Sequence, residues 1–161
     1  MSQANAHDIQ VLNTLTGAVL DSADGYGEAA GETENPGFRD LFERRSFERR
    51  QVAAELRAAV EALGGEVHVD GSILAKASRA FHDIRHALLG DELSVVGPVE
   101  AAEDGLKGRF EAALNDPAVS ATTRETIRRA YEAVKGGHDE MRELKHSLQG
   151  QRDASNRLFP Q

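Results

Sequence analysis

Apolar residues recur three and four positions apart along most of the chain, which is the spacing of one face of an α-helix. The first long stretch runs from about Asp8 to Ala30 and the second from Pro36 to Leu63. A shorter one covers Ser72 to Leu89. Two more long stretches run from about Glu92 to Leu114 and from the capping sequence Thr122-x-x-Glu125 to about Leu148. The pattern therefore predicts four long helices and one short helix.

The lengths of the connections predict how these helices are arranged. The breaks after the first and third long helices are short, so each of these helices should run antiparallel to the next one. The middle segment, about residues 64 to 91, is long enough to cross the whole bundle, since a helix rises about 1.5 Å per residue. The second and third long helices should then be parallel. We expect an all-α, ferritin-like four-helix bundle with a long crossover that carries an extra helix.

The two ends of the chain have weaker patterns than the middle. Residues 1–7 precede the first apolar stripe and are predicted to be a disordered N-terminus. Residues 8–148 form the predicted ferritin-like domain. From Gly150 the sequence is polar and small, so residues 149–161 are predicted to be a flexible C-terminal tail.

The second long helix combines apolar and charged residues on one face. At 100° per residue its apolar positions fall within one narrow sector, namely Phe38, Leu41, Val52, Leu56, Ala59 and Leu63. Arg45, Glu48 and Arg49 fall within the same sector. Charged side chains are rarely buried unless they are paired or bind a metal. This ionic layer is the first place to look for function.

Composition and charge exclude several classes of function. The net charge is −8, which disfavours binding to nucleic acid or to an anionic membrane surface. The chain has no cysteine, which removes disulfides, thiol nucleophiles and Cys-ligated zinc. No apolar run has the length of a membrane span and no signal peptide is evident, so we expect a cytoplasmic protein.

Four segments resemble a known family. They are Asp-Gly-Tyr-Gly-Glu-Ala-Ala at 24–30, the charged segment at 41–56, Gly-Ser-Ile-Leu at 71–74 and Tyr-Glu-Ala-Val-Lys-Gly-Gly-His-Asp at 131–139. Their order and spacing resemble a bacterial domain-of-unknown-function family of ferritin-like four-helix-bundle proteins, over about residues 8 to 148. The resemblance implies the fold and implies little about activity.

One interpretation of the ionic layer is a metal site. Ferritin-like di-metal proteins place one Glu on each of two helices and Glu-x-x-His on each of the other two. Glu48, Glu103 and His138 lie on apolar stripes at similar heights in the predicted bundle, so they could converge on iron or manganese. However, Gln51 stands where this pattern has a His, and Lys135 stands where it has a Glu.

The interpretation that we favour is an internal network of ion pairs. Glu48 and Glu103 would be neutralised by Arg45, Arg49 and Lys135. His138 and Tyr26 would complete the hydrogen bonds. We expect Glu48 itself to be buried and bonded to a basic group, so that Glu48→Ala lowers the melting temperature strongly.

Two smaller features are more ordinary. His82 and His86 are four residues apart on the short helix and could hold a surface metal, although such pairs are usually solvated. The acidic residues Glu28, Glu32 and Glu34 are expected to form a solvated helix end.

The sequence leaves two functions open. The first is a non-catalytic bundle without a cofactor that serves interaction, assembly or a stress response. The second is a metal-binding bundle that uses Glu48, Glu103 and His138. A homodimer is the expected assembly, and no other protein partner is indicated.

Overall fold

The computed structural model describes residues 2–68 and 92–158. In these ranges the structure is all-α, with four helices and no strand. The helices are α1 (Gln3–Glu32), α2 (Pro36–Ala62), α4 (Glu92–Leu114) and α5 (Ala121–Leu158). The predicted short helix at 72–89, with His82 and His86, lies outside the described residues. None of the described helices is both long enough and apolar enough to cross a membrane.

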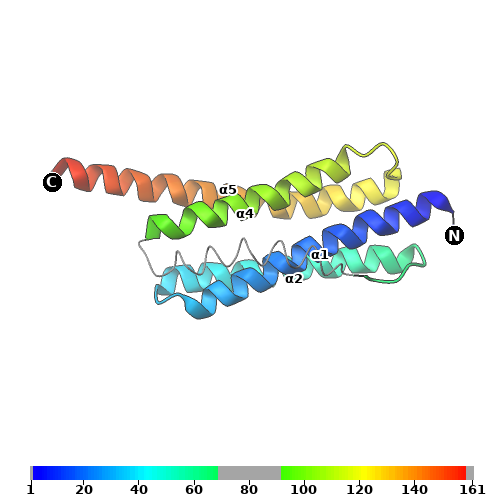
Figure 1. Cartoon of the computed structure of the whole chain (residues 1–161), viewed down its shortest axis with the longest axis horizontal. Coiled ribbons are helices and arrows are strands. Elements are labelled where there is room, and N and C mark those ends of the chain that lie inside the picture. The colour runs from blue at the N-terminus through cyan, green and yellow to red at the C-terminus, as the bar shows by residue number, and fades with distance from the viewer. Residues whose placement is uncertain (1, 69–91, 159–161) are drawn as a thin grey trace.

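The helix directions confirm the predicted arrangement (Figure 1). α1 runs antiparallel to α2 and α4 runs antiparallel to α5, whereas α2 and α4 run in the same direction. The most extensive packing is within the pairs α1–α2 and α4–α5. The two pairs then contact each other through α2 with α5 and through α1 with α4. Residues from all four helices therefore face one interior.

The first helix begins earlier than predicted. α1 starts at Gln3, within the segment that was predicted to be disordered. The Ser2 hydroxyl accepts a hydrogen bond from the backbone N–H of Asn5 and so caps the helix. The next turn is also stabilised by a tertiary contact, because His7 and Asp8 bond to the connection between α4 and α5. The spacing of apolar residues cannot reveal such a long-range contact, and this explains why α1 begins earlier than the sequence predicts.

The last helix is longer than predicted at both ends. α5 begins at Ala121, and Ser120 supplies the capping oxygen to the backbone N–H of Thr123, so the Thr122-x-x-Glu125 capping box is not used. Glu125 pairs instead with Arg128 at 2.7 Å. At the other end α5 continues through Gly150 to Leu158, where a flexible tail was predicted. One interior glycine costs a helix only about 1 kcal/mol relative to alanine, which helix-forming neighbours can offset.

The interior consists of two apolar clusters with a polar layer between them. The larger cluster fills the half of the bundle that contains the α4–α5 connection and includes Leu12, Leu56, Phe110 and Ile127. The smaller cluster lies towards the α1–α2 connection and contains Tyr26, Ala29, Ala30, Phe38, Phe42, Val99 and Met141. Phe42 packs on both Tyr26 and Phe38, with ring centroids 5.7 Å apart in each case. Buried charged side chains lie where the two clusters meet.

Candidate functional site

The centre of the polar layer is a fully buried chain of three side chains. Arg49 of α2 donates from Nη2 to Oε2 of Glu103 on α4, at 2.7 Å. Tyr26 of α1 donates its hydroxyl to the other oxygen of Glu103, at 2.6 Å. The side chains of Arg49 and Glu103 are each only 2% exposed. Three helices are thus joined through one carboxylate, both of whose oxygens are bonded.

Arg45, one turn before Arg49, forms the outer part of the layer. Its two terminal nitrogens each bond a carboxylate at 2.8 Å: Nη1 bonds Glu48 on the same helix, and Nη2 bonds Glu140 on α5. Arg44 contacts Glu140 as well. The Arg45 side chain is buried, but both of its carboxylate partners are partly exposed.

Glu48 lies in a different environment from the one predicted. It bonds Arg45, as expected, but its side chain is 43% exposed. The reason is its position on α2: Arg49 faces the core, whereas Glu48 is turned by 100° towards the seam with α5. Glu48 therefore lines the surface of the bundle instead of its interior.

Gly137 of α5 lies directly against the two guanidinium groups. A Cβ at this position would lie 2.5 Å from Nη2 of Arg49 and 2.7 Å from Nη1 of Arg45. A side chain at this position would therefore force one or both guanidinium groups to shift. The neighbouring Gly136 has no such role, because a Cβ there would meet nothing within 4 Å.

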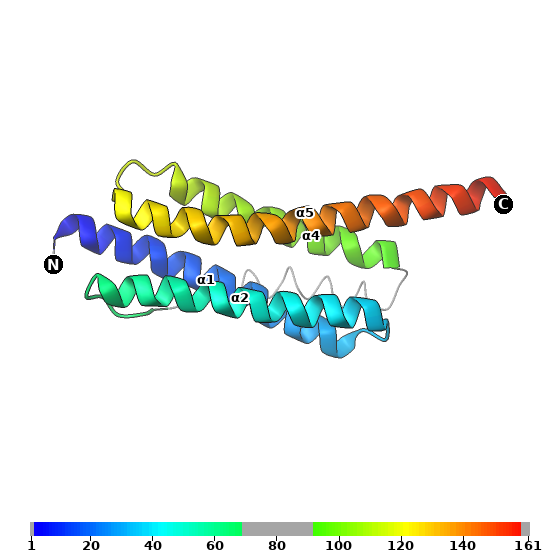
Figure 2. The same cartoon turned by 180° about the vertical axis from the view of Figure 1, so that it is seen from behind.

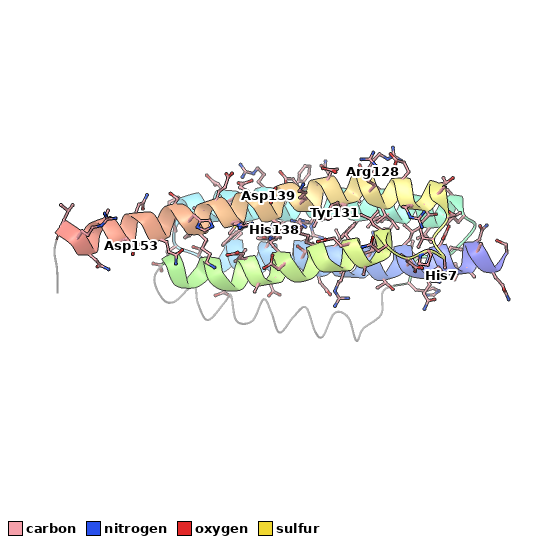
Figure 3. The ribbon with its side chains drawn as sticks, turned by 90° about the horizontal axis from the view of Figure 1, so that it is seen from above. His7, Arg128, Tyr131, His138, Asp139 and Asp153 are labelled. Carbon is pink, nitrogen blue, oxygen red and sulfur yellow. The ribbon has the colours of Figure 1, made fainter. Side chains whose placement is uncertain are left out.

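His138 is buried beside the layer but belongs to a separate contact. Its Nε2 contacts Oδ1 of Asp104 on α4, and its Nδ1 lies 3.3 Å from Oδ1 of Asp139. Figure 3 shows His138 on the side of α5 that faces α4. Since a carboxylate only accepts hydrogen bonds, both contacts are hydrogen bonds at once only if the imidazole carries a proton on each nitrogen.

Lys135 does not take part in the layer. Its side chain is exposed on α5, so the prediction that it neutralises a buried carboxylate is wrong. Glu140, which the sequence interpretation missed, supplies the contact from α5 instead. Two adjacent glycines inside a helix were the signal that could have located this close approach.

The predicted metal ligands are not gathered into one site. Glu103 bonds Tyr26 and Arg49, Glu48 bonds Arg45, and His138 contacts two aspartates. Across residues 2–68 and 92–158, no group of three or more His, Asp or Glu side chains is arranged to hold a metal ion. The side chains present therefore fit hydrogen-bonded ion pairs better than a di-metal centre.

Burial and neighbouring charges act together on the groups of this layer. Burial raises the pKa of the Tyr26 hydroxyl well above its usual value, and the negative charge of Glu103 raises it further. Burial acts to lower the pKa of Arg45, but the surrounding acidic groups outweigh it and raise that pKa. These groups are the carboxylates of Glu48, Glu103 and Glu140, together with the Tyr26 hydroxyl once it is ionised. The layer keeps Tyr26 neutral and Arg45 charged.

The network leaves some polar atoms without partners. Nε of Arg45 and Nη1 of Arg49 are buried and have no hydrogen-bond partner among the described residues. Each unsatisfied buried donor costs about 1–3 kcal/mol. The layer therefore differs from a well-packed apolar core. Buried ion pairs of this kind often fix which helices pack together without raising the free energy of unfolding above that of an apolar core.

Two further buried carboxylates were not foreseen from the sequence. Asp21 of α1 is 7% exposed, and its Oδ2 has no hydrogen-bond partner among the described residues. Burial and the nearby charge of Asp24 raise its pKa to about 6, although Arg109 acts in the opposite direction. Asp8 is fully buried but well bonded, because it accepts from the backbone N–H of Ser120 at 3.1 Å and from the Ser120 hydroxyl at 2.5 Å.

Asp8 shows the opposite electrostatic balance to Asp21. Burial acts to raise the pKa of Asp8, but the hydrogen bonds from Ser120 and Thr123 outweigh it and the net pKa is lowered. Next to it, Nε2 of His7 contacts Oδ2 of Asp116 at 2.7 Å. Together these two contacts fasten the first turns of α1 to the α4–α5 connection, and we call them the N-terminal clasp.

The fold and the site together define a class of protein, an all-α four-helix bundle with a buried ion-pair layer. A family model described as a domain of unknown function, DUF2383, matches residues 7–116, about two thirds of the chain. The chain belongs to this family. The matched residues include the Tyr26, Arg49 and Glu103 triad and most of the N-terminal clasp. No curated protein matches the chain.

Proposed function

We propose that this protein is a non-catalytic helical bundle that acts through contacts with other protein molecules, and that its ion-pair layer replaces a metal centre. One observation carries the proposal: both oxygens of Glu103 are bonded to protein groups, Tyr26 and Arg49. A cation at this carboxylate would have to displace the Arg49 guanidinium, which is itself buried. An uncompensated buried charge of that kind costs several kcal/mol.

The test is metal analysis combined with thermal unfolding. The protein is purified without a histidine tag, and its metal content is measured by mass spectrometry. Unfolding is then followed with and without added Fe²⁺, Mn²⁺ or Zn²⁺, for the wild type and for Glu103→Gln. We expect no stoichiometric metal and no metal-dependent rise in melting temperature. A rise in the wild type that is lost in Glu103→Gln would establish the alternative, an iron- or manganese-binding bundle that uses Glu48, Glu103 and His138.

The cellular setting is part of the same proposal. The lack of cysteine and the net charge of −8 fit a protein of the cytoplasm. A role in a stress response is the physiological context we infer for a bundle of this type. Fractionation of cells, with the amount of protein measured before and after oxidative or nutrient stress, tests both statements.

A further inference from the structure

α2 and α5 leave an open groove of about 1030 Å³ along their seam. Much of its lining is apolar or small, including Val52, Ala59, Ala133 and Gly136. Small side chains on two neighbouring helices let a third helix approach closely, as they do where helix backbones pack at short distance. The groove therefore has the shape to receive a helix.

The last part of α5 extends beyond the rest of the bundle (Figures 1 and 2). From His146 to the end of the helix, every side chain that the structure describes is exposed, and Leu158 is 75% exposed. Asp153 marks this overhang in Figure 3. A solitary helix of about 13 residues is only marginally stable in water. Packing against another molecule would stabilise it.

One face of α5 is continuous from the groove into the overhang. The groove side of α5 contains Ala133, Gly136 and Glu140. At 100° per residue, the same side continues as Leu144, which packs partly against the interior of its own bundle, and then as Ser147, Gln151, Ala154 and Leu158 in the overhang; none of these residues is charged. An uncharged helix face with leucine and alanine at three- and four-residue spacing is suited to burial against another helix.

We propose that the overhang of α5 binds in the α2–α5 groove of a second copy of this chain. This inference names the partner in the protein contacts proposed above, namely a second copy. It rests on the proposed function only in that the bundle acts through protein contacts. The groove covers about residues 126–140 of α5, and the uncharged face that continues it into the overhang covers about residues 144–158. These segments are equally long, about 22 Å each. A two-fold axis near Arg142 therefore places each overhang along the other copy's groove.

The antiparallel register follows from this symmetry. Ala133 of one copy lies opposite Gln151 of the other, and Gly137 lies opposite Ser147. Both pairs join a small residue of the groove to an uncharged residue of the overhang. The interface is isologous, so it forms twice in each dimer and closes without further growth.

The charges of the two segments are complementary. The groove is lined by four carboxylates, those of Glu48, Glu55, Glu132 and Glu140, against the two guanidinium groups of Arg45 and Arg129. From His146 onward the overhang carries two basic residues, Arg152 and Arg157, against the single acid Asp153. Lys145, just before it, forms an ion pair with Glu100 of its own bundle at 3.0 Å. A basic segment in a chain of net charge −8 fits an acidic groove of the same chain. This complementarity favours a second copy over an acidic partner.

The first test blocks the groove with Gly136→Arg and uses Gly108→Arg as the matched control. A Cβ at either glycine meets nothing within 4 Å, so both variants should fold, which circular dichroism checks. Gly108 lies on α4, away from the groove. Sedimentation equilibrium of the full chain should give a dimer mass for the wild type and for Gly108→Arg, and half that mass for folded Gly136→Arg. A monomeric wild type, or a dimer that persists in Gly136→Arg, would overturn the proposal.

The second test fixes the register with cysteines, of which the chain has none. Ala133 and Gln151 lie about 27 Å apart along one helix. A disulfide needs Cα atoms within about 7 Å, so the double variant Ala133→Cys/Gln151→Cys can crosslink only between copies. Mild oxidation should convert it to a covalent dimer and leave each single variant monomeric on a denaturing gel. Absence of the crosslink, or crosslinking of both single variants alone, contradicts the arrangement. Neither result depends on the metal experiment, so the two proposals fail separately.

Discussion

The two arginines of the polar layer are one helical turn apart, and their partners differ in exposure. Arg49 bonds Glu103 with both side chains 2% exposed, whereas Arg45 bonds Glu48, of which 43% is exposed. Chemically the pairs are the same. Energetically they should differ, because removing one partner of a buried pair leaves a charge without solvent, while a partner at the surface can be replaced by water. The burial of the partner, more than the bond length, decides what each pair contributes.

The largest expected effect is at the buried pair. Glu103→Ala should lower the free energy of unfolding by about 3–5 kcal/mol, because Arg49 loses its carboxylate and Tyr26 its acceptor. Urea unfolding followed by circular dichroism measures the change. Glu103→Gln is the control, since it keeps the shape and removes the charge. A loss below about 1 kcal/mol for Glu103→Ala would mean that Arg49 and Tyr26 find other partners or water when the carboxylate is removed.

Asp21 sharpens the comparison, since it is buried and none of the ion pairs among the described residues includes it. Its pKa of about 6 in the folded state exceeds the usual value of 3.8, so the folded state holds this proton more tightly than the unfolded state. The contribution of Asp21 to stability is therefore favourable at low pH and is lost as the pH rises from about 4 to 6. Asp21→Asn should stabilise the protein on the order of 2–3 kcal/mol at pH 7 and hardly at all near pH 4. Unfolding curves at both pH values test this, and a gain that does not depend on pH would refute it.

Gly137 tests whether the arginines are held rigidly. Gly137→Ala places a methyl group 2.5 Å from Arg49 and 2.7 Å from Arg45, so the bonded guanidinium groups must shift. We expect a loss of about 1–2 kcal/mol, after the better helix propensity of alanine is included. Gly136→Ala, one residue away and unobstructed, should instead gain up to about 1 kcal/mol. Equal effects of the two substitutions on the melting temperature would show that the layer adapts.

The smallest effect is expected at the partly exposed pair. Glu48→Ala should change the free energy of unfolding by about 0–1 kcal/mol, because Arg45 keeps Glu140 and the lost carboxylate was already partly in water. This replaces the strong destabilisation expected from the sequence. The loss should shrink further in high salt, which screens exposed charges. If Glu48→Ala melts at as low a temperature as Glu103→Ala, the partly exposed pair contributes as much stability as the buried pair, and the comparison fails.

The sequence predicted the four long helices and their directions because periodicity and chain breaks are local properties. It also placed Arg45, Arg49, Glu103 and His138 correctly on buried faces. It failed for Glu48 and Lys135, because spacing on one helix does not show how close the neighbouring helix comes.

Contacts between distant segments were harder to predict. Glu140 joins α5 to Arg45 across 95 residues, and the partners of Asp8 are 112 residues away. No local pattern records such distances. The length of α5 was missed for a related reason: the sequence beyond Gly150 resembles a tail because every side chain that the structure describes there is exposed.

The N-terminal clasp has a consequence for the order in which the molecule assembles. Asp8 is synthesised before its partner Ser120, which lies 112 residues later in the chain. At roughly 10 residues per second, about 10 s pass before that partner exists. The α1–α2 hairpin can form during this interval from local contacts, but its first turns stay open until the α4–α5 connection has emerged. Closure of the clasp is therefore a late folding event, and a peptide that ends before Ser120 lacks the two donors that Asp8 uses there.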